Sequence, residues 1–229
     1  MIFRDLRKLI SSVGQHAGTK LACHAGVGAW ITIFYYGPQR WPLYPARPAP
    51  MLAVDGWVPF QPEWALVYQS VFIVHTLAFW LPRDPEAVKR YARSVAAVFV
   101  CGAVVFWLYP TISPRPAESG SFLHQWLISA VDGQRNAFPS LHAAMGLLAA
   151  LAVGSHLRAC RVSPWWRAAL ALWWIAMLYS TLATRQHRLL DLLAGILLGL
   201  LSFVLSSVTS QTIHRHDPFP SPPDQSPVL

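Results

Sequence analysis

Arg135-Asn-Ala-Phe-Pro-Ser-Leu-His142 leads directly from polar residues into a long apolar segment, and Thr184-Arg-Gln-His-Arg-Leu-Leu-Asp191 does the same further along the chain. The buried ends of apolar helices do not ordinarily carry histidine, arginine and aspartate, because removing such groups from water costs free energy. The two stretches therefore predict a polar site at the ends of apolar helices.

The composition around these stretches is that of a membrane protein. Hydrophobic residues make up 54% of the chain and charged residues 12%, whereas about a quarter of the residues in soluble domains are charged. Nearly uncharged segments, each close to the roughly 20 residues that cross a bilayer, lie at 21–36, 64–81, 94–110, 141–157, 165–183 and 189–208. We predict an all-α integral membrane protein with a bundle of six transmembrane helices.

The basic residues predict the orientation, because positively charged loops stay on the cytoplasmic side. With both termini cytoplasmic, twelve of the eighteen lysines and arginines lie inside: Arg4, Arg7, Lys8, Lys20, Arg83, Lys89, Arg90, Arg93, Arg158, Arg161, Arg167 and Arg215. The outer set is Arg40, Arg47, Arg115, Arg135, Arg185 and Arg188. The net charge of +8 is then explained by topology and attraction to lipid headgroups, and no nucleic-acid partner is expected. The expected partners are membrane lipids.

The chain is predicted to form one domain with two flanking segments. Residues 1–20 have the pattern of an amphipathic helix on the cytoplasmic surface, 21–210 form the membrane domain, and 211–229, rich in Pro and Ser, are expected to be a disordered cytoplasmic tail. Aromatic residues at 30–36 replace the small residues of a signal-peptide cleavage site, so the first span is predicted to be retained. The three cysteines show no paired spacing.

The span count brings the two polar stretches together. His142 opens the fourth span and His187 precedes the sixth, so two crossings separate them and both lie on one face of the membrane. Arg115, at the end of the third span, belongs to the same face. Helix amino termini favour anions, because their free N–H groups and the helix dipole point at them. A phosphate group is therefore the expected ligand of this site.

The spacing of His187 and Asp191 places both side chains on one face of a helix, one turn apart. A carboxylate within a span is costly and usually functional, and a carboxylate that holds one imidazole nitrogen makes the other a better nucleophile or base. We predict that this pair is catalytic. Guanidinium groups donate well-placed hydrogen bonds to phosphate oxygens. The candidate phosphate-binding residues are therefore the arginines on this face: Arg115, Arg135, Arg185 and Arg188.

These residues resemble the motifs of a known family. Phe138-Pro-Ser-Leu-His142 is similar to the second motif, Pro-Ser-Gly-His, of the type 2 phosphatidic acid phosphatases (PAP2). Ser180 to Asp191 is similar to their third motif, Ser-Arg, five residues, His, three residues, Asp. The leucine in place of glycine, together with the ending His-x-x-x-Asp-x-x-x-Gly195, is closest to the branch that contains inositol phosphorylceramide synthases.

The resemblance implies a lipid phosphatase or phosphotransferase that works without a cofactor. His187 would attack phosphorus to form a phosphohistidine, Asp191 would orient it, and His142 would protonate the leaving group. Ser140 and Arg115 would bind phosphate oxygens. The site would face the periplasm or exterior of a plasma membrane, here expected to be a bacterial inner membrane. The lipid, and whether water or an alcohol is the acceptor, stay open.

Two cations of the family pattern are absent. Leu108 stands where the first motif has lysine, and Thr181 where the third motif has arginine. Arg185 would replace one of them and Arg135 or Arg188 the other. No metal is predicted, because metal-assisted phosphoryl transfer needs converging carboxylates and those of the outer face are scattered. The stretch Asp55-Gly-Trp-Val-Pro-Phe60 either shapes a lipid entrance or packs against the wall of the bundle.

Other interpretations also fit parts of the pattern. Pro139 and Ser140 alone could mark only a helix start, and His187 with Asp191 alone could be a structural pair. A transporter would need its charges at mid-depth, and a serine hydrolase centred on Ser140 lacks a Gly-x-Ser-x-Gly elbow. A catalytically silent phospholipid-binding member remains the main alternative to an enzyme.

Overall fold

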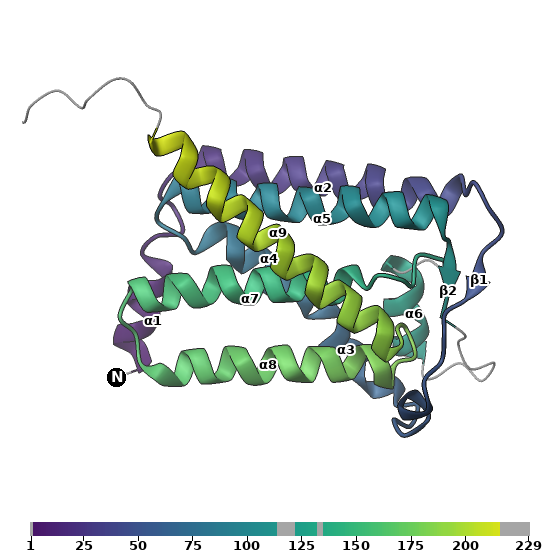
Figure 1. Cartoon of the computed structure of the whole chain (residues 1–229). Helices are drawn as coiled ribbons and strands as arrows, with labels where there is room; N and C mark the ends of the chain where they lie inside the picture. Colours follow the sequence, from purple (N-terminus) through teal and green to yellow (C-terminus); the bar gives the residue numbers. More distant parts are fainter. Residues whose placement is uncertain (1, 114–121, 132–134, 216–229) are drawn as a thin grey trace, which may run out of the picture.

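The fold is a bundle of long helices, seen here in a computed structural model that describes residues 2–113, 122–131 and 135–215. Figure 1 shows the long helices running between two ends of the molecule, with α9 crossing obliquely over α7. The long helices are α2 (Ala17–Arg40), α5 (Pro85–Leu108), α7 (Leu141–Ala159), α8 (Pro164–Ala183) and α9 (Leu189–Arg215). The prediction of a mostly helical chain is therefore confirmed.

Each predicted span is helical, but the second is broken into α3 (Ala65–Gln69) and α4 (Val71–Trp80). Ser70 stands at the break, where its hydroxyl donates to the Val67 carbonyl and accepts a hydrogen bond from Trp173 of α8. Within the described residues, three helices are long and apolar enough to cross a membrane: α5, α7 and Leu189–Val208 of α9. Crossing by the other predicted spans stays a prediction.

Helix α7 is the central element, because it packs against α4, α5, α8 and α9. Small and aliphatic side chains cover nearly its whole length and are buried, among them Ala144, Leu148 and Val153. They meet Phe79 of α4 and Met177 of α8 in the core. The N-terminal end of α7, which carries His142, is thus held from several sides.

Two glycines let α9 approach α7 closely. A Cβ atom added at Gly195 would collide with the main-chain carbonyl oxygen of Ser140, and one at Gly199 would lie 3.0 Å from the carbonyl oxygen of Ala144. Small residues four apart commonly allow helix backbones to meet in this way. The contact fixes the start of α9 against the start of α7.

The N-terminal helix α1 (Ile2–Ile10) is attached to one end of the bundle. Its Asp5 accepts a hydrogen bond from the Ser163 N–H before α8, and Lys20 donates to the carbonyls of Ser12 and Trp80. Within the predicted segment 1–20, this helix covers only Ile2–Ile10, with Phe3 exposed and Leu9 buried, and α2 already begins at Ala17. Its location on the membrane surface stays a prediction. The C-terminal end of α9 lies at the same end of the molecule (Figure 1). It runs to Arg215, into the predicted tail, and 216–229 lie outside the described residues.

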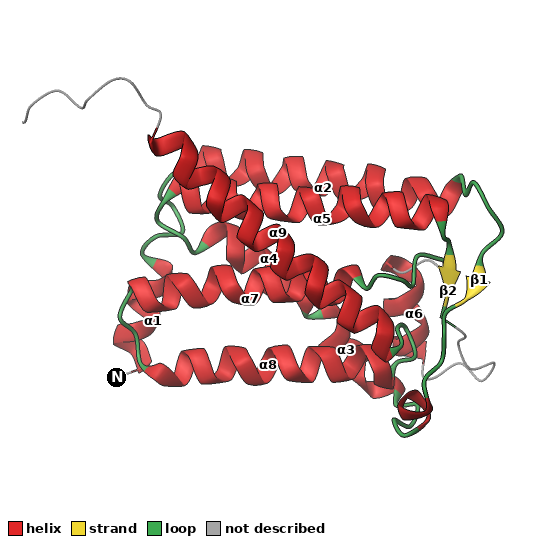
Figure 2. Ribbon diagram, in the orientation of Figure 1, coloured by secondary structure: helices red, strands yellow, loops and turns green. Residues whose placement is uncertain are grey.

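The opposite end is covered by short elements that the sequence did not predict. Strands β1 (Arg47–Pro48) and β2 (Thr111–Ile112) pair in parallel, with Arg47 opposite Thr111. Figure 2 shows this pair beyond the ends of the long helices. The remaining elements there are the 3-10 turns η1 (Ala53–Gly56) and η2 (Pro62–Trp64) and helix α6 (Phe122–Val131). Together these segments connect the helices around the two histidines.

Candidate active site

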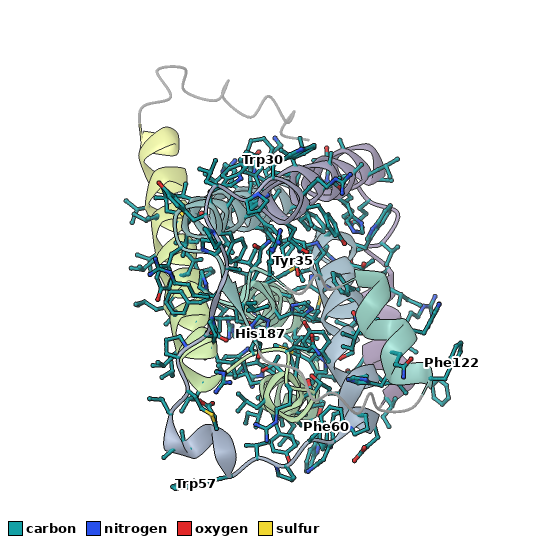
Figure 3. The ribbon with its side chains drawn as sticks, turned by 90° about the vertical axis from the view of Figure 1, so that its right-hand side faces the viewer. Trp30, Tyr35, Trp57, Phe60, Phe122 and His187 are labelled. Carbon is teal, nitrogen blue, oxygen red and sulfur yellow. The ribbon has the colours of Figure 1, made fainter. Side chains whose placement is uncertain are left out.

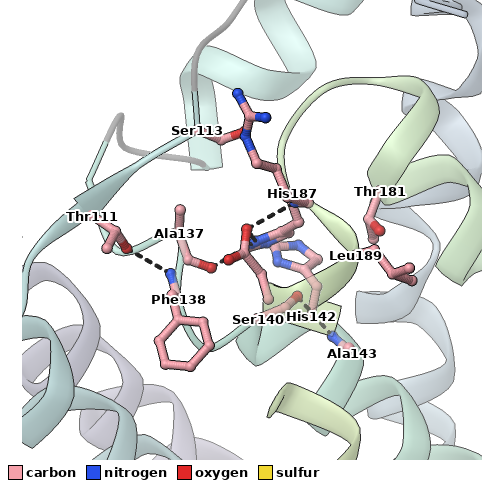
Figure 4. Close-up of polar contacts among 12 residues, drawn as sticks. Thr111, Ser113, Ala137, Phe138, Ser140, His142, Ala143, Thr181, His187 and Leu189 are labelled. Carbon is pink, nitrogen blue, oxygen red and sulfur yellow. Dashed lines mark hydrogen bonds and ion pairs between the residues drawn. The ribbon is translucent and has the colours of Figure 1, made fainter. Parts of the chain in front are cut away.

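The two predicted catalytic histidines lie next to each other. The ring centroids of His142 and His187 are 6.0 Å apart at an angle of 51°, and each residue is only 7% exposed. Figure 4 shows the two rings together with Ala137 and Ser140 nearby. In the end-on view of Figure 3, His187 is surrounded by helices, whereas Trp57 and Phe122 lie at the edge. The structure therefore brings the two polar stretches into one site.

Ser140 starts α7 and joins it to α9. Its hydroxyl caps the helix by accepting the Ala143 N–H at 3.2 Å, and its own N–H donates to the Asp191 carbonyl at 2.9 Å. The preceding segment is held by Thr111 of β2, whose side chain accepts the Phe138 N–H at 2.8 Å. These bonds fix the direction in which His142 leaves the first turn of α7.

A tight loop between α8 and α9 presents His187. The Thr181 carbonyl accepts the N–H groups of both Gln186 and His187, at 3.1 and 3.2 Å. Arg185 makes this turn possible by adopting a left-handed backbone, with φ of 57°, a conformation that is uncommon for residues other than glycine. The loop is thus folded back on the last turn of α8, and His187 points towards α7.

The orientation of the His187 ring is set mainly by a main-chain carbonyl. Its Nδ1 is 2.9 Å from the Ala137 carbonyl oxygen, which can only accept, so Nδ1 carries the proton. In a neutral ring the lone pair is then on Nε2. Asp191 Oδ2 is 3.8 Å from Nδ1 and accepts the Arg188 N–H at 2.8 Å. The carboxylate thus lies beside the ring without a direct hydrogen bond to it.

Asp191 is fully buried at 0% exposure, so its charge is close to the ring and shielded from water. Its Oδ1 has no hydrogen-bond partner among the described residues. A buried carboxylate in this position favours a positive charge on a neighbouring imidazole. The arrangement suits a reaction in which His187 becomes cationic.

Tyr68 of α3 holds the His142 ring. Its hydroxyl is 3.0 Å from His142 Nδ1, and the two rings stack with centroids 4.1 Å apart. Phe72 contacts the same imidazole edge-on. With Nδ1 engaged, proton exchange with a bound group is assigned to Nε2. Tyr68 was not among the sequence-predicted residues, because an aromatic residue in an apolar span carries no signal of its own.

The four predicted phosphate-binding arginines are placed differently. Arg185 donates from both terminal nitrogens to main-chain carbonyls, those of Asp55 and Val58, at 2.7 Å each. Arg135 is exposed and donates to the Gln39 carbonyl. The buried Nε of Arg188 has no hydrogen-bond partner within the described part of the chain. Arg115 lies outside the described residues.

Asp55 connects the first outer loop to the histidine segment. One carboxylate oxygen accepts the Leu189 N–H at the start of α9, and the other accepts the Leu52 N–H, both at 2.8 Å. A carboxylate at a helix amino terminus satisfies a free N–H group and interacts well with the helix dipole. The Asp55 stretch therefore packs on the loop that presents His187.

The positions of the missing cations are occupied by residues with other roles. Leu108 is exposed at the end of α5, and the Thr181 hydroxyl donates to the Leu178 carbonyl. Among residues 2–113, 122–131 and 135–215, no three His, Cys, Asp or Glu side chains are grouped so that they could hold a metal ion. The described cations closest to the histidines in sequence are Arg185 and Arg188.

Comparison with known proteins identifies the family. Residues 58–205, which include both histidine segments, match the family model of the PAP2 superfamily, whose members are phosphatases and phosphotransferases. Comparisons with curated proteins and with solved structures give no match. The matched range spans more than half of the chain and contains α7, α8 and the site end of α9. The chain therefore belongs to the PAP2 superfamily.

Proposed function

We propose that this protein is an integral membrane enzyme that takes a phosphoryl or phosphoalcohol group from a lipid phosphate ester and passes it to water or an alcohol. The observation that carries the proposal is the pair of buried imidazoles, His142 and His187, with ring centroids 6.0 Å apart. Each ring is held through Nδ1, so both can present Nε2 to a substrate. Two oriented imidazoles supply a nucleophile and an acid–base group.

The reaction has two displacements at phosphorus. In the first, His187 Nε2 forms a bond to phosphorus while the ester P–O bond breaks, and His142 gives its proton to the leaving oxygen. In the second, His142 takes a proton from water or an alcohol, whose oxygen attacks phosphorus as the N–P bond breaks. The phosphorylated imidazole is cationic, and the buried Asp191 carboxylate, 3.8 Å from Nδ1, stabilises that charge.

Phosphate oxygens in this proposal are bound by Arg188 and by the first turn of α7. The Arg188 Nε is buried without a partner among the described residues, and the first N–H groups of a helix have no intrahelical acceptors. Arg115 and Ser140 complete the set proposed from the sequence. Arg185 and Arg135 act at the rim, since each also holds a main-chain carbonyl.

The proposed topology has six spans, both termini in the cytoplasm and the site on the outer face of a bacterial inner membrane. Three helices of sufficient length and hydropathy support insertion. The location of α1 and the C-terminal end of α9 at one end of the molecule supports an even number of crossings (Figure 1). The residues Leu141 and Gly195 favour the inositol phosphorylceramide synthase-like branch.

A lipid panel tests the function and identifies the acceptor. Purified protein is incubated with phosphatidic acid, phosphatidylglycerophosphate, a polyprenyl pyrophosphate and a phosphoinositide, and free phosphate and new headgroup esters are followed together. Free phosphate alone indicates a phosphatase, and a new ester indicates a transferase. If no lipid yields either product above the level of the His187→Ala variant, the protein is a silent phospholipid-binding member.

Turnover is expected to survive metal chelation. The proposed mechanism uses histidine as nucleophile and arginine as the phosphate ligand, so no step requires a divalent ion. Activity in excess EDTA should stay within about twofold of the untreated value, a change below about 0.5 kcal/mol in the barrier. Abolition by EDTA and recovery on adding a divalent cation would contradict the histidine mechanism.

Replacing Tyr68 by phenylalanine is expected to slow the reaction while leaving the protein folded. The change keeps the ring stacked on His142 and removes the hydroxyl 3.0 Å from Nδ1. A hydrogen bond of this kind contributes about 1 kcal/mol, so kcat should fall by roughly fivefold to tenfold. The pH dependence of kcat should shift as well, because Tyr68 acts through the imidazole.

Tyr179→Phe is the matched control for this change. The Tyr179 hydroxyl accepts a hydrogen bond from the Gln61 side chain, and its ring contacts Trp64. That variant should keep the wild-type pH profile. An unchanged pH profile for Tyr68→Phe would assign Tyr68 a packing role only.

A further inference from the structure

A cavity of about 560 Å³ lies at the end of the bundle opposite His187. Its walls come from the start of α5, the second half of α7 and the C-terminal half of α9. It is within the range of about 300–1,000 Å³ that is typical of ligand pockets. His142 opens α7, whereas His156 near the end of that helix lines the cavity. Fourteen residues of helix separate them by roughly 21 Å, so the cavity is distinct from the candidate active site.

The cavity follows from the way α9 crosses α7. Gly195 and Gly199 hold the two backbones together near Ser140 and Ala144. Beyond this contact, α9 diverges from α7 on its way to Arg215 (Figure 1). Phe203 and Ser207 of α9 line the wedge that this divergence opens. The cavity therefore results from the angle at which α9 crosses α7.

The lining combines two arginines with apolar side chains. Arg83 is exposed and Arg90 is half-buried, whereas the lining residue Leu148 is buried and Ala152 and Phe203 are half-buried. The guanidinium of Arg90 has no hydrogen-bond or ion-pair partner within the part of the chain that the structure describes. Arg83 contacts the Ser11 hydroxyl at 3.0 Å and retains further N–H donors. An anion with an attached hydrocarbon chain would satisfy both parts of this lining.

Asp84, the acidic residue of the lining, repels a bound anion only weakly. Both oxygens of Asp84 already accept main-chain N–H groups, from Glu86 and Ala87, and so cap α5. Nearby Glu86 is paired with Lys89 at 2.7 Å. The lining therefore keeps a net positive charge from its two arginines.

We propose that this cavity binds an anionic glycerophospholipid from the leaflet opposite the candidate active site, with its phosphate at Arg83 and Arg90 and an acyl chain against Leu148, Ala152 and Phe203. The proposal rests on the membrane insertion proposed above. Basic pockets between transmembrane helices on the cytoplasmic side commonly bind anionic headgroups. A free phosphate ion would leave the apolar side chains of the lining unused.

Binding can be measured without turnover. The full chain carrying His187→Ala is purified in mild detergent, freed of lipid, and titrated with dioleoyl phosphatidylglycerol or dioleoyl phosphatidylcholine by native mass spectrometry. The anionic lipid should bind about tenfold more tightly, as expected for one or two charge-assisted hydrogen bonds. Arg90→Gln should remove most of this preference, and the double variant Arg83→Gln/Arg90→Gln all of it.

Arg93→Gln is the matched control. It makes the same change in charge on the same helix, but Arg93 does not line the cavity. Its lipid preference should stay within about twofold of the parent. Ala152→Phe, which fills the apolar part of the cavity, should weaken both lipids.

Three results would overturn the proposal. Arg93→Gln could weaken the anionic lipid as much as Arg90→Gln, which would show diffuse surface charge. The arginine variants could keep the full preference, which would place the lipid elsewhere. Millimolar inorganic phosphate could displace the lipid, which would indicate an anion site without a lipid chain. Since the readout is binding by a His187→Ala protein, each outcome is independent of whether the wild type turns over lipid.

Discussion

Replacing His187 by alanine is expected to lower kcat/KM for release or transfer of the lipid phosphate by about 10⁴-fold or more, the scale seen when a catalytic unit loses its nucleophile. This corresponds to about 5 kcal/mol of transition-state stabilisation. The physical reason is that the variant has no group able to form the N–P bond. His142 does not replace His187 in the proposed mechanism, because it starts a different helix, α7, and serves there as the acid–base group.

The matched control is His75→Ala. His75 is also buried, and its Nδ1 also makes one hydrogen bond, to the Tyr91 hydroxyl at 2.6 Å. It lies in α4, where its ring contacts Phe79 and Tyr91. The control should lose thermal stability while keeping its kcat within a few fold of wild type. His187→Ala should keep its thermal stability and lose its turnover. Turnover by His187→Ala at the wild-type rate would contradict the proposed nucleophile.

His142→Ala should have a smaller effect than His187→Ala. Positioned acid–base help is worth about 10²- to 10⁴-fold in rate, and the nucleophile remains. The loss should be greatest for lipids whose leaving group is a poor one. A variant series measured on esters of alcohols with different acidities would separate the acid from the nucleophile.

Gly195→Ala is expected to damage both stability and activity. The added Cβ would overlap the Ser140 carbonyl oxygen and lie 3.1 Å from its carbonyl carbon and 3.2 Å from the Ala143 Cβ. Main-chain atoms cannot rotate away as a side chain would, so α9 must move off α7. Overpacking of this kind costs about 1–3 kcal/mol. The thermal unfolding temperature should fall clearly.

The same movement would disturb the site. Ser140 donates its N–H to the Asp191 carbonyl, and Asp191 lies one helical turn before Gly195. A misplacement near 1 Å in a catalytic group can cost about 100-fold in rate, and kcat should fall on that scale. Gly28→Ala is the control, since nothing lies within 4 Å of a Cβ there. Wild-type stability and rate in Gly195→Ala would show that the helices do not meet at this glycine.

The sequence predicted the site well where helix periodicity and topology were sufficient. His142 and His187 were expected on one face because two crossings separate them, and their rings are indeed neighbours. The prediction that His187 and Asp191 share one face of a helix was wrong, because His187 lies in the loop before α9, which begins at Leu189. The two side chains still lie 3.8 Å apart. The predicted spans correspond to helices, because each is a continuous apolar run.

Features that depend on contacts between distant segments could not be predicted. The ring of His187 is bonded to the Ala137 carbonyl, and any residue type supplies such a carbonyl. Tyr68, in the short helix α3 before the break at Ser70, contacts His142 across 74 residues of sequence. Asp55 was singled out by its stretch, but its partner, the Leu189 N–H at the start of α9, was visible only in three dimensions.

The most direct test of the account is capture of the covalent intermediate. The wild-type protein is mixed with a lipid carrying a labelled phosphate, quenched in base within the first turnovers, and digested for peptide mapping. Phosphohistidine survives base and is lost in acid, unlike a phosphoserine ester. We predict acid-labile label on the peptide containing His187, absent from His187→Ala. Label on Ser140 or another residue, or label that persists in His187→Ala, would contradict the account.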